Sequence, residues 1–152
     1  QFEIKAQKNL LSVFLVEDSP ISFDLIKTNI GSTAFQDETL IIVKSTIDKL
    51  TCTVNNVKEL VENLYTEFLE KPELQVIVTD LISISESYKN LNSHEFENII
   101  KENINKINQC EREQERLKLQ SLYNNVNDDD TEALKVQMQL RDKINNRRKI
   151  ND

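Results

Sequence analysis

Residues 39–71 read TLIIVKSTIDKLTCTVNNVKELVENLYTEFLEK, and apolar side chains recur in this stretch at strict intervals of three and four. They are Leu40, Val43, Ile47, Leu50, Val54, Val57, Val61, Leu64 and Phe68. This alternation is the heptad pattern of helices that pack against other helices, and the period-two pattern of a strand is absent. We therefore predict one helix of roughly 30 residues, some 45 Å long at 1.5 Å per residue.

The composition favours helices throughout the chain. Its 152 residues include one glycine and two prolines, and 30% of the residues are charged. Sheet proteins need many tight turns, which glycine and proline supply, whereas a few long helices need almost none. The predicted fold class is all-α: an elongated bundle of about four to five coiled-coil-like helices whose packing depends on a partner.

A second apolar seam follows Pro72, in a different register. It comprises Leu74, Ile77, Leu81, Ile84, Tyr88 and Leu91. Since the residue before a proline is disfavoured in the α conformation, we expect a break near residue 72. A further break is expected near residue 92, where Asn92 and Glu95 have the spacing of a capping box. A third helix should then run through Phe96, Ile100 and Ile107.

The two ends of the chain are less regular. Residues 10–16 (LLSVFLV) fit a buried strand or a buried helix equally well. Ser19 and Pro20 suit the start of a short helix over residues 19–30, which Gly31 would end. Near the other end, residues 124–130 (NNVNDDD) are expected to form a loop that ends in an acidic run, and a basic C-terminal helix would begin with Asp129 as its N-cap. The expected domains are thus residues 1–38, 39–126 and 127–152.

Charge and hydropathy narrow the choice of partner. The net charge of −7 and the pI near 4.9 argue against nucleic acid, which would be repelled unless basic residues were segregated. No apolar run approaches the roughly 20 residues of a membrane span. Cys52 and Cys110 lack a CxxC partner and are expected to be buried, reduced thiols. We therefore expect an intracellular protein, cytoplasmic or nuclear; because it begins with Gln1, the sequence is expected to be part of a longer chain.

No residue pattern predicts catalysis, and we expect no enzyme, no small-molecule substrate, no cofactor and no metal site. The predicted function is that of a structural subunit that binds other helical proteins, as a hetero- or homo-oligomer. The predicted partner interface is Leu50, Val54, Val57, Val61, Leu64, Phe68, Ile77, Leu81 and Ile84. The alternative is that these residues form only the chain's own core.

Two short segments suggest a different class of function. Residues 13–20 (VFLVEDSP) and 75–81 (QVIVTDL) resemble two strands and the acidic sites of a two-component receiver domain. The resemblance covers about 15 residues and lacks that family's later Lys-Pro pair. The resemblance implies a divergent, inactive receiver-like signalling domain. By the same resemblance, Glu17 and Asp18 stand at the Mg²⁺-binding positions and Asp80 at the position that accepts the phosphoryl group.

Overall fold

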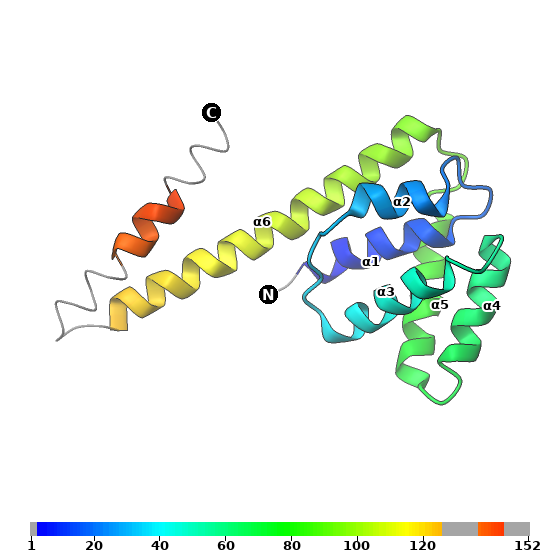
Figure 1. The fold of residues 1–152 in the computed structure, drawn as a ribbon, viewed down its shortest axis with the longest axis horizontal. Coiled ribbons are helices and arrows are strands. Elements are labelled where there is room, and N and C mark those ends of the chain that lie inside the picture. Colours follow the sequence, from blue (N-terminus) through cyan, green and yellow to red (C-terminus); the bar gives the residue numbers. More distant parts are fainter. Residues whose placement is uncertain (1–2, 126–136, 145–152) are drawn as a thin grey trace. The chain divides into compact units, whose positions relative to one another are not determined.

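The computed structural model describes residues 3–125 and 137–144, and every regular element in those ranges is a helix (Figure 1). The all-α prediction is therefore confirmed. The expected four to five helices are too few, because residues 3–125 alone form six α-helices and a short 3₁₀ helix, and residues 137–144 are also helical. The elements are α1 (Ile4–Ser12), η1 (Val13–Leu15), α2 (Phe23–Ile30), α3 (Glu38–Leu50), α4 (Val57–Glu67), α5 (Pro72–Glu86) and α6 (Ser93–Asn125).

The chain divides into two compact units. One spans Phe2–Asn108, and the other comprises Gln109–Asp152 together with Gln1. Helix α6 contributes residues to both units, since it runs through Asn108 without interruption. The hydrophobic core described below belongs to the first unit.

The apolar run at residues 10–16 is helical up to Leu15, while Val16 is extended, and the run forms the centre of the core. Leu10 and Leu11 lie in α1, Val13 and Phe14 lie in η1, and all four are at most 1% exposed. Helix α1 packs against α5, and η1 packs against both α4 and α5. The segment can be apolar all round because these helices cover it on several sides, which is the condition for a fully buried helix.

The N-cap of α2 lies three residues later than the sequence predicts. Its N-cap is Ser22, whose hydroxyl accepts a hydrogen bond from the backbone N–H of Leu25 at 3.2 Å. The Ser19 hydroxyl instead donates to the backbone oxygen of Ile21 in the preceding turn. Gly31 ends the helix as predicted, with a φ of +57° that a side chain would strain.

The single long helix predicted over residues 39–71 is wrong, because α3 and α4 are separate helices. Helix α3 ends at Leu50, and α4 begins at Val57 after an irregular turn. The side chain of Asn56 caps α4 by accepting from the N–H of Glu59 at 2.9 Å. The Glu59 carboxylate accepts in return from the N–H of Asn55 at 2.9 Å. Cys52 lies in this turn and is exposed, so its predicted burial is also wrong.

The strands implied by the receiver resemblance are likewise absent. Val13–Leu15 is the 3₁₀ helix η1, and residues 75–81 belong to α5. Asp80 lies on the surface of α5 and pairs with Lys8 of α1 at 3.5 Å, with half of its side chain exposed. A receiver site needs carboxylates gathered at the end of a sheet, and this fold provides no such edge among its described residues.

Helix α6 starts at the predicted capping box. The Asn92 side chain accepts from the N–H of Glu95 at 2.8 Å, and the Glu95 carboxylate accepts from the N–H of Asn92 at 3.3 Å. Three apolar residues of its first half, Phe96, Ile100 and Ile107, are at most 1% exposed. One polar residue is buried among them: Asn103, 4% exposed, whose carbonyl accepts a hydrogen bond from the Asn9 amide of α1 at 3.1 Å.

Replacing Asn92 by alanine should lower the free energy of unfolding by about 0.5–2 kcal/mol, because α6 would lose its N-cap. Urea denaturation followed by circular dichroism measures this. The matched control is Asn105→Ala, on an exposed position inside α6, where alanine is the better helix former and no loss is expected. Equal stabilities for the two variants would contradict the capping role.

The second unit contains an antiparallel pair of helical segments. The amide of Gln137 donates to the Tyr123 hydroxyl at 2.7 Å, and Lys143 forms an ion pair with Glu115. Residues 137–144 are helical, as predicted for the end of the chain. The loop predicted at 124–130 is wrong at its start, because residues 124 and 125 are the last residues of α6. The rest of that loop and the Asp129 cap lie outside the described residues.

Candidate functional site

The nine residues predicted as a partner interface do not lie on one free surface. Leu64, Phe68 and Leu81 are at most 2% exposed and belong to the chain's own core. Their apolar surface is therefore already covered from within the chain. The partly buried residues that pack against this core are Leu50, Val54, Val61 and Ile77. Val57 and Ile84 are also partly exposed.

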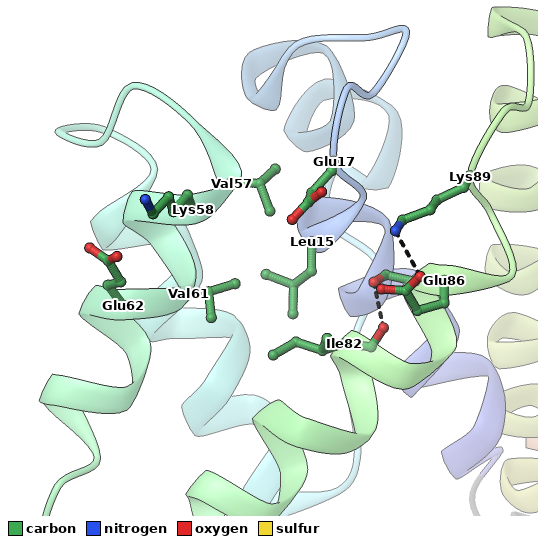
Figure 2. A pocket seen from close by; sticks show the side chains of 10 residues that line it. Leu15, Glu17, Val57, Lys58, Val61, Glu62, Ile82, Glu86 and Lys89 are labelled. Carbon is green, nitrogen blue, oxygen red and sulfur yellow. Dashed lines mark hydrogen bonds and ion pairs between the residues drawn. The ribbon is translucent and has the colours of Figure 1, made fainter.

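Val57 and Val61, however, line an open cleft, which we call the α4–α5 cleft. Its volume is about 260 Å³. Its floor is aliphatic and consists of Leu15, Val57, Val61 and Ile82. Its rim carries Glu17, Lys58, Glu62, Glu86 and Lys89, and Ser85 completes the lining. Figure 2 shows the floor residues facing one another across the gap between η1, α4 and α5.

Local structure fixes the two walls of the cleft. The Asn56 cap places Val57 at the first position of α4, so Val57 and Val61 lie one turn apart on the same face. The opposite wall is the last turn of α5, where Ser85 is 3% exposed and its hydroxyl donates to the backbone oxygen of Ile82 at 2.6 Å. The floor is therefore held by helix caps and hydrogen bonds rather than by a free loop.

The charges on the rim are of both signs. Glu86 and Lys89 form an ion pair at 2.8 Å. The hydrogen bond to Glu86 raises the pKa of Lys89, and the charges of Glu86, Glu17 and Asp18 add to this. In Figure 2 the Glu17 carboxylate points over the floor, whereas Lys58 and Glu62 point away from it. The cleft thus has an aliphatic floor and one carboxylate, that of Glu17, which is directed over this floor.

The polar side chains of the cleft are three carboxylates, two ammonium groups and one hydroxyl. Ser85 is the single hydroxyl among its lining residues, and this hydroxyl is committed to the Ile82 carbonyl. In the part of the chain that the structure describes, no three His, Cys, Asp or Glu side chains come together in a way that could hold a metal ion. Nor is any helix of residues 3–125 or 137–144 long and apolar enough to cross a membrane.

Other hollows of the first unit are less suited to a partner. One, of about 210 Å³, lies between residues 16–20 and 88–91 and is lined mainly by polar groups. Burial raises the pKa of the Tyr88 phenol at its edge, and a hydrogen bond with Ser12 opposes this rise. Another, of about 330 Å³, is a more open depression beside Phe35 and Lys44.

Sequence reasoning found two of the four floor residues and missed the others. Leu15 lies in η1, far from α4 in the chain, and Ile82 lies in the next helix, α5; only the tertiary fold brings both beside Val57. No protein-family model matches the chain, and neither a curated protein nor a solved structure matches it. The cleft is therefore interpreted from its own chemistry alone.

Proposed function

We propose that residues 2–108 form a non-enzymatic interaction module, a subunit of a larger helical assembly, that binds a partner helix through the α4–α5 cleft. The observation that supports this is the aliphatic floor of the cleft between η1, α4 and α5, where Val57, Val61 and Ile82 are partly exposed and Leu15, 3% exposed, forms the base. Apolar surface that stays exposed in a folded chain, with a polar rim around it, is typical of interaction sites.

The size of the cleft favours a protein partner over a small ligand. Small-molecule sites usually occupy roughly 300–1,000 Å³ and enclose most of the ligand. At about 260 Å³ the α4–α5 cleft is smaller than that, and one side of it is open. It suits one or two aliphatic side chains, which an amphipathic helix presents on one face at intervals of three or four residues.

A single aliphatic side chain of the partner, buried on the cleft floor, should contribute substantially to the binding free energy. Full burial of one leucine side chain contributes roughly 1.5–3 kcal/mol. This corresponds to roughly ten- to a hundredfold in affinity. The remaining contacts would come from side chains at the rim, which set specificity more than strength.

Replacing Val57 by aspartate should weaken partner binding by roughly tenfold or more, because a charge would replace part of the aliphatic floor. Helix α4 should survive, since an acidic residue in the first turn of a helix is favourable. The measurement is affinity capture of the full chain from its source cells with quantitative mass spectrometry, followed by titration of the captured partner.

The matched control is Val76→Asp. Val76 lies on α5 outside the cleft and is 60% exposed, so the same change there leaves the floor intact. A partner retained by Val76→Asp and lost by Val57→Asp would support the proposal. Equal capture by both variants and the unaltered chain would contradict it.

A further inference from the structure

The net charge of the chain is confined to the unit that contains the cleft. Residues 2–108 carry 17 acidic and ten basic side chains, which gives −7, whereas residues 109–152 carry nine of each. The first unit therefore accounts for the whole net charge. A field of this sign attracts cationic partners and repels anionic ones.

Within the cleft, carboxylates outnumber ammonium groups. Three glutamates and two lysines line it, which leaves a local charge of −1. Glu86 already has Lys89 at 2.8 Å. Glu17 forms no ion pair with the described residues, although its charge contributes to the raised pKa of Lys89, whose ammonium group is already paired with Glu86. Figure 2 shows the Glu17 side chain directed over the floor.

The position of Glu17 restricts what can cover the floor. Glu17 is exposed and follows Val16, which is 1% exposed, so its backbone is anchored while its carboxylate is hydrated. An occupant that seats an aliphatic side chain on Leu15 and Ile82 must also displace water from this carboxylate. Removing water from a charge without offering a counter-charge is unfavourable, so a neutral or acidic occupant would lose much of the gain from the floor.

We infer that the occupant is a basic amphipathic helix of another protein, with an aliphatic anchor on the cleft floor and an arginine or lysine that reaches Glu17. The inference rests on the proposed function and specifies its partner. Arginine suits the geometry best, because its apolar stem can lie along the aliphatic floor while its planar head pairs with the carboxylate.

Two synthetic helical peptides test this with the full chain. They are identical except that one carries arginine, and the other glutamate, one helical turn after a single leucine. Fluorescence anisotropy of the labelled peptides gives the affinities. At about 10 mM salt the arginine peptide should bind several-fold tighter, and at about 1 M salt the preference should nearly vanish, because the Debye length falls from about 30 Å to about 3 Å.

The variant Glu17→Gln should remove the preference for arginine while binding through leucine remains. Glu70→Gln is its matched control, because Glu70 is exposed and does not line the cleft; here the preference should persist. If Glu17→Gln leaves the preference unchanged, the role given to Glu17 is overturned.

The outcomes separate this inference from the proposed function. Equal binding of both peptides, weakened for both by Val57→Asp, would overturn the basic partner and leave the proposed function standing. Absence of binding, or binding indifferent to Val57→Asp, would overturn both. Concentration-dependent self-association that competes with the arginine peptide would identify a second copy, with its basic Arg141 and Lys143, as the occupant instead of another protein.

Discussion

Leu64→Ala is expected to destabilise the purified chain by about 2–5 kcal/mol, with no partner present. Leu64 is 0% exposed and lies in the core formed by α1, η1, α3, α4 and α5. The smaller side chain would lose apolar burial and leave a cavity that the neighbouring helices fill only in part. Chemical denaturation followed by circular dichroism measures the change.

Leu69→Ala serves as the matched control, because Leu69 follows α4 and is 71% exposed. Its substitution should alter stability by less than about 0.5 kcal/mol. The two variants distinguish the two interpretations of the apolar residues in the stretch 39–71, namely a partner interface and the chain's own core. A Leu64→Ala chain as stable as the Leu69→Ala chain would mean that Leu64 does not belong to the chain's own core.

Phe96→Ala should cost about 3–5 kcal/mol, the largest effect expected of any single change discussed for this chain. Phe96 is 1% exposed and lies in the first turn of α6, next to the Asn92–Glu95 capping box. The variant removes the aromatic anchor that holds the start of α6 on the core. Denaturation of the full chain gives the total loss, and hydrogen exchange shows where protection is lost.

Two further variants on the same helix calibrate this effect. Phe96→Leu keeps an apolar side chain and should lose less stability than alanine does. Leu117→Ala, on a residue that is 53% exposed, should lose little. If protection in α1 and α5 were unchanged in Phe96→Ala, the anchoring of α6 to the core would be disproved.

The periodic pattern of residues 39–71 predicted helix correctly on both sides of a turn that it concealed. The intervals Leu50–Val54–Val57 continue the three-and-four spacing across the turn, so the heptad count shows no interruption. A signal for the break was nevertheless present. Asn56 and Glu59 have the same spacing as Asn92 and Glu95, and both asparagines cap a helix by accepting from the glutamate N–H. Glu95 returns the bond to the N–H of Asn92 in a full capping box, whereas Glu59 accepts from Asn55, one residue before its cap.

At the start of α2, two serines compete as the N-cap. Ser19 and Ser22 are both suitable N-caps, and Pro20 favours the first of them. Ile21 and Ile26, which flank Ser22 at the positions of a hydrophobic staple, are both buried. Burial of this pair is a tertiary property, so the sequence alone could not choose between the two serines.

The candidate site could be predicted only in part, for the same physical reason. Val57 and Val61 were recognised because periodicity within one helix reveals its apolar face. Leu15, Ile82 and Glu17 reach the cleft through the packing of η1 and α5 against α4. Contacts between segments so distant in the chain leave no local pattern in a single sequence.

The amide pair Asn9–Asn103 has a consequence for the uniqueness of the fold. Apolar packing alone does not fix the position of α6 along its axis, because after a shift one apolar side chain could occupy the place of another. Asn103 is 4% exposed, and its amide nitrogen donates to the Ile99 carbonyl of the same helix. A slip of one turn, about 5.4 Å, would keep that bond but leave the Asn103 side-chain oxygen without the Asn9 amide that donates to it. A buried polar group without a hydrogen-bond partner lowers the stability of the fold by about 1–3 kcal/mol. The Asn9–Asn103 hydrogen bond therefore favours one position of α6 along its axis over other positions that would bury a similar apolar surface.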